Sequence, residues 1–137
     1  MDYKFIPHTA DVKIHAEGPG IEEAFVSSAM ALKEAILDFE KVKILEKIKR
    51  KIEVEGKDNE SLLYNFLEEF LFLLDAEDFM LSKISKLEID NGKLHAEILG
   101  DKWSKYDLGN KVKAVTYNEM FVRQEGNKWI VELVIDV

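Results

Sequence analysis

The sequence predicts an α+β fold in which a mainly antiparallel sheet has two helices packed on one face, as a single two-layer domain. Segments with alternating apolar and polar residues outnumber those with a helical period. The last four strand segments follow one another like hairpins, and each helical segment follows an early strand. The 137 residues contain no repeat or linker and have the usual length of one domain, so we expect residues 1–137 to form one unit.

The first half of the chain contains both helical segments. Residues 12–16 alternate as a short strand does, and a Gly-Pro-Gly break follows at residues 18–20. A helix is then predicted from Ile21 to about Leu37, with acidic residues in its first turn. Residues 47–55 form a strand with one solvent-exposed face, and Asp58 or Asn59 can begin a second helix. Its apolar positions, which recur over four turns, are Leu63, Phe66, Leu67, Phe70 and Leu74.

The second half of the chain is dominated by strands. Residues 87–98 are predicted to form a hairpin, because Asn91 and Gly92 favour a type I′ turn. A polar loop leads to a strand over residues 112–122, and a turn at Gly126 and Asn127 leads to a last strand over residues 129–137. Because the last strand is apolar on both faces, we expect it to be central in the sheet.

The composition limits the function classes. The chain has no cysteine, which excludes disulfides and thiolate chemistry and favours a cytoplasmic location. Its longest apolar run, residues 70–74, is much shorter than a membrane span, so no membrane association is expected. A formal net charge of −8 repels phosphate backbones, so direct nucleic-acid binding is not expected either.

Carboxylates near the two ends of the chain are the candidate functional groups. The side chain of Asp136 and the α-carboxylate of Val137 place two negative charges close together. Asp11 can supply a third anionic group if the first strands lie beside the last. Oxygen ligands suit Mg²⁺, Mn²⁺ and Ca²⁺, so one interpretation of this arrangement is a site for a divalent metal ion. The alternative is that Asp11 caps a turn and the chain end is solvated.

His8 and the basic residues between positions 41 and 51 each allow a structural and a functional interpretation. His8, three residues before Asp11, either orients that carboxylate or satisfies hydrogen bonds within its own turn. The basic residues between positions 41 and 51 form either the solvent-exposed face of a strand or a surface that guides a partner.

The chain has neither a nucleophile elbow nor a Gly-rich phosphate-binding loop, which argues against a serine hydrolase or a nucleotide kinase.

Four blocks of sequence resemble the archease family. His8-Thr9-Ala10-Asp11 followed by Ile21-Glu22-Glu23-Ala24-Phe25 is similar to the opening of these proteins. Residues 61–69 resemble their second helix, and Val112-Lys113-Ala114-Val115-Thr116-Tyr117 resembles their Lys-Ala-Ile/Val-Thr-Tyr strand. Val134-Ile135-Asp136-Val137 is similar to their acidic C-terminus. The four blocks occur in order and span nearly the whole chain.

The resemblance implies a non-catalytic accessory protein of RNA ligation. Archeases help the GTP-dependent tRNA-splicing RNA ligase to take up GMP on its own histidine and to turn over repeatedly. By similarity, Asp11, Asp136 and the terminal carboxylate of Val137 hold a divalent metal ion (Ca, Mg or Mn), and Lys113 is needed for ligase activation. Many family members have a histidine where this chain has Asn118, which leaves the ligand set open.

Two alternatives from other function classes remain. The first is a binding module that steers a tRNA-modifying enzyme such as a tRNA methyltransferase, a role also linked to archeases. The second is a metal-dependent hydrolase that acts alone at Asp11 and Asp136.

Overall fold

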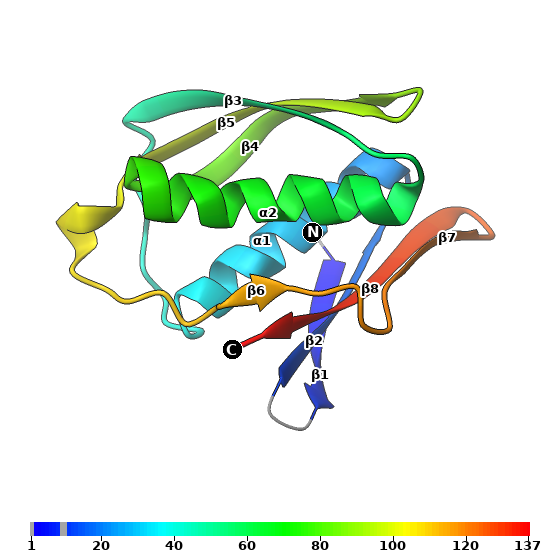
Figure 1. Ribbon diagram of the computed structural model, residues 1–137, viewed down its shortest axis with the longest axis horizontal. Coiled ribbons are helices and arrows are strands. Elements are labelled where there is room, and N and C mark those ends of the chain that lie inside the picture. The colour runs from blue at the N-terminus through cyan, green and yellow to red at the C-terminus, as the bar shows by residue number, and fades with distance from the viewer. Residues whose placement is uncertain (1, 9–10) are drawn as a thin grey trace.

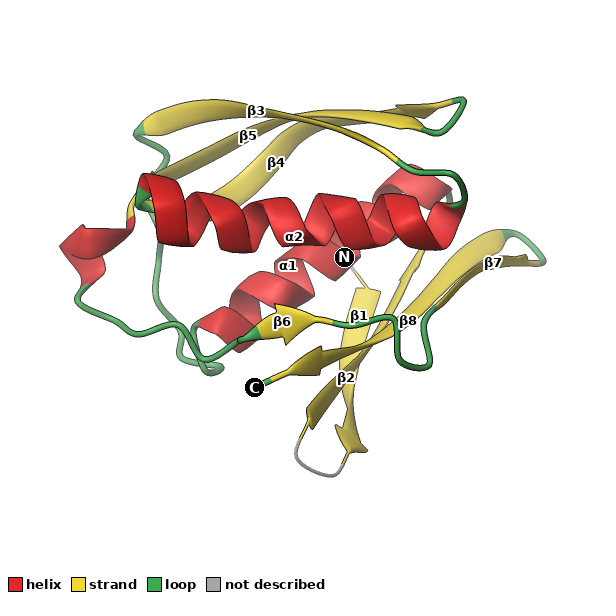
Figure 2. Cartoon of the chain, in the orientation of Figure 1, coloured by secondary structure: helices red, strands yellow, loops and turns green. Residues whose placement is uncertain are grey.

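The strands are arranged in two antiparallel sheets with the helices between them. The structure is a computed structural model that describes residues 2–8 and 11–137, without the side chains of residues 7 and 8. Within these residues it has eight strands, two α-helices and one short 3₁₀ helix, Trp103–Tyr106. Figures 1 and 2 show the two sheets on opposite sides of the helix pair.

The larger sheet, as far as the described residues define it, has five strands and contains both ends of the chain. Its order is β1 (Asp2–His8), β2 (Asp11–Gly18), β8 (Lys128–Asp136) and β6 (Ala114–Val115). β7 (Phe121–Glu125) also pairs with β8, on the same side as β6. The last strand is therefore central, as its two apolar faces predict.

The smaller sheet covers the helices from the other side. In the described part of the chain it has three strands, in the order β3 (Ile48–Glu55), β5 (Lys93–Lys102) and β4 (Phe79–Asp90). The β4–β5 hairpin turns at Asn91 and Gly92, whose φ angles of 52° and 78° confirm the predicted type I′ turn.

Each helix packs against strands of both sheets. α1 (Ile21–Ile36) contacts β1, β2 and β8 of the larger sheet and β4 of the smaller one. α2 (Asn59–Glu77) contacts the smaller sheet and also β6 and β7. It begins at Asp58, whose side chain accepts the backbone N–H of Ser61 at 2.7 Å in a capping box. No helix among the described residues is long and apolar enough to span a membrane.

The α+β class, the antiparallel pairing and the two helices are confirmed, whereas the predicted two-layer arrangement is wrong. The strands form two sheets, and the helices are covered on both sides. The physical reason lies in α2, whose buried residues span about half of its circumference at about 100° per residue, a wider face than one sheet covers. Its buried residues are Leu62, Leu63, Phe66, Leu67, Phe70, Leu71, Leu73 and Leu74.

Two strand predictions also need correction. The expected strand over residues 112–122 is divided into β6 and β7, because the backbone turns between them. The N–H of Met120 bonds to the carbonyl of Tyr117 at 3.1 Å, and Glu119 has a positive φ of 55°. β1 was not predicted at all, and β2 is longer than the expected residues 12–16.

Candidate functional site

Asp11 and Asp136 lie opposite each other on neighbouring strands. β2 and β8 pair antiparallel, and their register places Asp11 directly against Asp136. Directly opposed residues on antiparallel strands project to the same face of the sheet, with Cβ atoms about 4.5–5.5 Å apart. Asp11 is half-buried and Asp136 is exposed. The two carboxylates that the sequence singled out are thus brought together by the register of the central strand.

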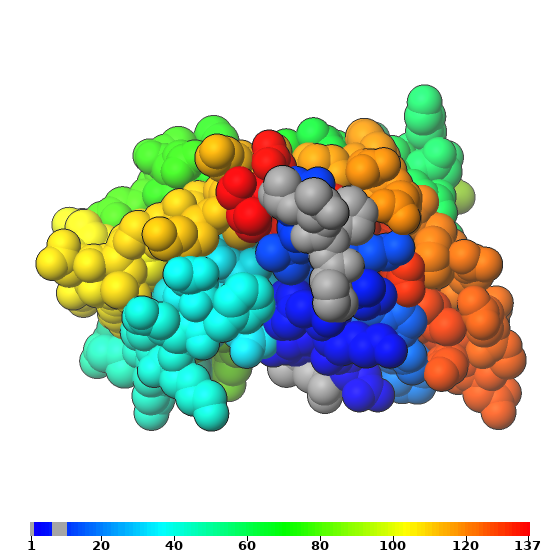
Figure 3. Space-filling model, turned by 90° about the horizontal axis from the view of Figure 1, so that it is seen from below, coloured from blue at the N-terminus to red at the C-terminus, as the bar shows by residue number. Residues whose placement is uncertain are grey.

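β6 lies on the other side of Asp136. Ala114 pairs with Asp136, and the N–H of Lys113 donates to the Asp136 carbonyl at 2.8 Å. Lys113 and Val137 are both exposed, and the C-terminal residues lie at the molecular surface beside the segment that precedes β6 (Figure 3). All four predicted site residues, Asp11, Lys113, Asp136 and Val137, therefore belong to one end of the larger sheet.

The turn after β6 is fixed by its own hydrogen bonds. The Thr116 hydroxyl donates to the Val134 carbonyl at 2.8 Å and accepts the N–H of Asn118 at 3.2 Å. Asn118 is exposed and follows directly after Tyr117. The side-chain amide of Asn118 therefore lies on the turn just beyond β6.

The donor set fits a hard divalent cation only in part. Among the residues that the structure describes, no group of three or more His, Cys, Asp or Glu side chains is arranged to hold a metal ion. Asp11 and Asp136 offer oxygen donors from facing positions, which is the chemistry that Ca²⁺, Mg²⁺ and Mn²⁺ prefer. A third protein donor would come from the carboxylate of Val137. The His8 side chain, Thr9 and Ala10 lie outside the described residues, so the rest of the His-Thr-Ala-Asp block is not placed.

A polar network covers the same face of the sheet next to the candidate site. The Lys13 ammonium lies 3.2 Å from Glu119 and 3.3 Å from Glu132. His15 contacts Glu132 through Nδ1 at 2.8 Å and Glu17 through Nε2 at 2.7 Å. This alternation of charges makes the outer face of the sheet a continuous hydrogen-bonded surface.

The network shifts the pKa values of Lys13, Glu17 and Glu132. The hydrogen bond to Glu119 is the main reason that the pKa of Lys13 is raised. Burial pushes the pKa of Glu132 upward, but hydrogen bonds from His15 and Lys13 outweigh it and hold that pKa below its ordinary value. Hydrogen bonds from His15 and Lys128 lower the pKa of Glu17. These groups therefore keep their charges at neutral pH, which fixes the charge pattern beside Asp11.

Sequence reasoning missed this network, although part of its signal was present. Lys13, His15 and Glu17 alternate along β2, so they share a face by the period of two. Their partner Glu132 is 117 residues away from His15 in sequence, and only the register of β2 against β8 brings it close.

A model of the Archease protein family matches residues 3–137.

The chain belongs to the archease family.

Relatives and solved structures agree with the archease fold described above. An archease of Pyrobaculum neutrophilum is 44% identical over 142 residues, which cover 99% of this chain and 95% of that protein. The solution structure of a Methanobacterium thermoautotrophicum protein has a TM-score of 0.77 at 30% identity and covers 98% of both chains. A Thermotoga maritima archease, described as a possible chaperone, has a TM-score of 0.63 over 98% of this chain and 96% of its own. At 16% identity, that likeness concerns the fold alone.

Proposed function

We propose that this chain is a metal-binding accessory protein that activates the GTP-dependent tRNA-splicing RNA ligase by promoting its guanylylation and multiple turnover. The observation that carries the proposal is the register that sets Asp11 directly opposite Asp136. Membership of the archease family supports the partner, because the family resemblance implies this ligase.

Asp11, Asp136 and the carboxylate of Val137 form the proposed metal ligands. Two like charges that face each other across a sheet destabilise it, and a cation between them removes that cost. Asp11 and Asp136 would hold a divalent ion there, which would supply positive charge to neutralise phosphate oxygens during guanylyl transfer. Asp11 and Asp136 hold such an ion at a strand end that a partner can reach, because Asp136 is exposed.

Lys113 is the proposed contact for ligase activation. Its N–H is fixed to the Asp136 carbonyl, which leaves the long side chain on the exposed side of the chain next to the carboxylates. An ammonium group on such a tether binds phosphate oxygens or an acidic surface of the partner. The proposed role therefore needs the charge of Lys113 but not its backbone bond, which any residue except proline provides.

The test is guanylylation and turnover of the purified ligase with GTP and RNA ends, with and without this protein. We expect stimulation by the unmodified chain and its loss with Asp11→Ala or Asp136→Ala. Glu40→Ala is the matched control, because it removes an exposed carboxylate in the loop after α1. Full stimulation by both aspartate variants would exclude the proposed site, and no stimulation by the unmodified chain would exclude the proposed partner.

The same assay separates the two alternatives. Turnover of a phosphoester substrate by this protein without any partner would favour a metal-dependent hydrolase. A change in the product pattern of a tRNA methyltransferase, without any effect on the ligase, would favour a binding module for that enzyme.

A further inference from the structure

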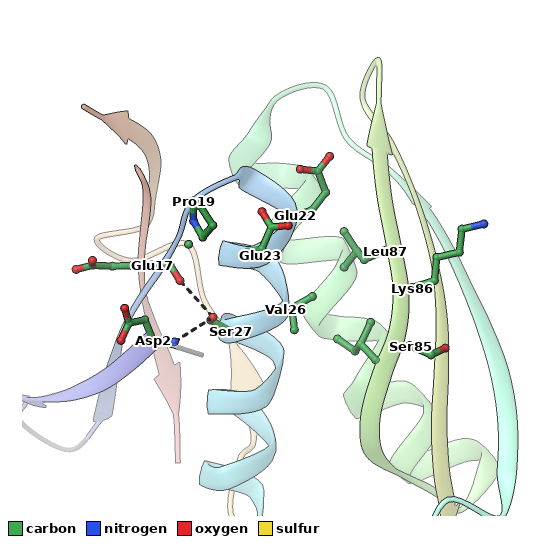
Figure 4. A pocket seen from close by; sticks show the side chains of 12 residues that line it. Asp2, Glu17, Pro19, Glu22, Glu23, Val26, Ser27, Ser85, Lys86 and Leu87 are labelled. Atoms are coloured by element: carbon green, nitrogen blue, oxygen red, sulfur yellow. Dashed lines mark hydrogen bonds between the residues drawn. The ribbon is translucent and has the colours of Figure 1, made fainter. Parts of the chain in front are cut away.

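A groove runs between α1 and β4, next to the ends of β1 and β2 (Figure 4). Its volume is about 370 Å³, and it is lined by the first turns of α1, the ends of β1 and β2, and the middle of β4. Its lining residue on β2 nearest to Asp11 is Glu17, six residues further along the strand, a distance of about 20 Å at the usual rise of a strand. The groove is therefore separate from the candidate metal site.

The floor of the groove is apolar and only half covered. Val26 of α1 faces Leu87 of β4 across the gap (Figure 4). Ile84 of β4 also lines the groove. All three side chains are half-buried. β4 is an edge strand with two register irregularities. Within the described residues it pairs with β5 on one side and with no strand on the other. The apolar surface thus continues to an open side of the smaller sheet.

The rim of the groove carries carboxylates. A Cβ atom added to Gly20 would contact Oε1 of Glu23 and lie 3.5 Å from Oε1 of Glu22, so both carboxylates converge over this glycine. Within the described part of the chain, neither has a hydrogen bond or an ion pair. Lys86, which also lines the groove, points away from the gap (Figure 4), and its ammonium lies 3.1 Å from Glu88.

The rim is held in place by the start of the chain. The N–H of Asp2 donates to the Ser27 hydroxyl at 3.4 Å, and that hydroxyl donates to the Glu17 carbonyl at 3.2 Å. Ser27 is 2% exposed, so these bonds fix α1 against the ends of β1 and β2. The carboxylate of Asp2 thereby stays near the mouth of the groove (Figure 4).

Carboxylates in the first turn of a helix also complement its dipole, which explains the charges of Glu22 and Glu23 but not the uncovered apolar floor beneath them. A long basic side chain matches both features, because its methylene groups cover apolar surface while its charged end reaches carboxylates. Arginine suits such a site best, since its planar group donates two parallel hydrogen bonds to a carboxylate. The net charge of −8 further favours a basic partner.

We propose that this groove binds a segment of a partner protein in which arginine or lysine alternates with a large apolar residue. The apolar side chain lies on Val26, Ile84 and Leu87, and the basic side chain pairs with Glu22 and Glu23. This surface operates independently of the candidate metal site, and its assignment does not depend on the proposed ligase function.

The test uses three short fluorescein-labelled peptides with the full-length protein. One alternates leucine with arginine, the second leucine with glutamate, and the third serine with arginine. Fluorescence anisotropy is expected to show binding of the first peptide and at least about tenfold weaker binding of the other two. Methyl NMR spectra of the unmodified protein are expected to show shifts at Val26, Ile84 and Leu87 when the first peptide binds.

A matched pair of variants separates the groove from general electrostatics. Glu22→Gln with Glu23→Gln is expected to weaken binding about tenfold, the effect of losing two exposed ion pairs. Glu53→Gln with Glu55→Gln removes the same charge from another acidic surface, on β3 and beside His95, and is expected to leave binding unchanged. Circular dichroism checks that both variants are folded.

Several outcomes would overturn the assignment. Equal weakening by the two double variants, or equal binding of the serine–arginine peptide, would reduce the interaction to net charge. Methyl shifts confined to other residues would place the peptide elsewhere, and this readout needs no variant. Self-association that is lost with the Glu22→Gln and Glu23→Gln changes would identify a second copy of this chain as the occupant.

Discussion

Replacing Asp136 with asparagine is expected to stabilise the metal-free protein. The side chain of Asp136 faces Asp11 across the β2–β8 pair, so two negative charges lie next to each other in the absence of a cation. The substitution keeps the size of the side chain and leaves the backbone carbonyl that accepts the N–H of Lys113. It therefore removes the repulsion without removing a backbone bond.

The expected gain follows from the spacing of the two charges. Two carboxylates about 6 Å apart in water repel by about 0.7 kcal/mol. A Debye length of about 30 Å at roughly 0.01 M salt leaves most of this repulsion, whereas one of about 8 Å at physiological ionic strength halves it. Because Asp11 is half-buried, we expect a gain of about 0.5–1 kcal/mol at low salt, or about 2–4 °C in melting temperature.

The assay is thermal and urea unfolding in chelator at two salt concentrations. Glu40→Gln is the control, because it removes one negative charge from an exposed loop residue and is expected to change stability by less than about 0.5 kcal/mol. A loss of stability in Asp136→Asn, or a gain that does not shrink with salt, would refute the view that the two carboxylates repel each other.

Three further substitutions test how the fold is held together. Burial and the neighbouring carboxylate of Glu34 raise the pKa of Tyr3 to about 12, so its phenol is expected to titrate later than an ordinary tyrosine in ultraviolet absorbance. The stability that this shift contributes is complete below pH 10 and is lost as the pH rises towards 12, a loss that Tyr3→Phe removes. Gly100→Ala is expected to cost about 3 kcal/mol or more, because the added methyl group meets a carbonyl oxygen of β4. Tyr106→Phe is expected to lower the melting temperature, because its hydroxyl donates at 2.7 Å to the buried carboxylate of Asp101.

Each of these three substitutions has its own control or contradicting result. The late step of the titration curve is expected to disappear in Tyr3→Phe. If that step persists, another tyrosine has the raised pKa. For Gly100, the comparison is Gly109→Ala, where no atom of the described residues lies within 4 Å of the added methyl group. Equal stability of the two variants would contradict the steric argument. An unchanged melting temperature in Tyr106→Phe would show that the remaining donors to Asp101, the N–H of Lys102 and the ammonium of Lys105, suffice.

Local sequence signals predicted the elements that depend on neighbouring residues. The Asn91-Gly92 turn, the start of α2 at Asp58 and the end of α1 before Leu37 follow from backbone preferences within a few residues, and all three are confirmed. The division of the strands into two sheets does not follow from such signals, because either sheet accepts strands of the same period. The break between β6 and β7 was missed because its turn uses Glu119 at positive φ instead of glycine.

The candidate site was only partly predictable for the same reason. Asp11 and Asp136 could be selected as carboxylates near the two ends of the chain, but their facing positions depend on the pairing of β2 with β8. The position of Lys113 followed from the family resemblance and not from charge or periodicity. The groove between α1 and β4 had no signal in the sequence, since Val26 and Leu87 each read as ordinary apolar positions.

Isothermal titration calorimetry of the metal-free protein with Ca²⁺, Mg²⁺ and Mn²⁺ tests the site most directly. We expect one ion per chain for at least one of the three metals, and no binding to Asp11→Asn or Asp136→Asn, while Glu40→Gln binds like the unmodified protein. Heat of binding that persists unchanged in both aspartate variants, or no uptake of any of the three ions by the unmodified chain, would contradict the assignment of these facing carboxylates to a metal ion.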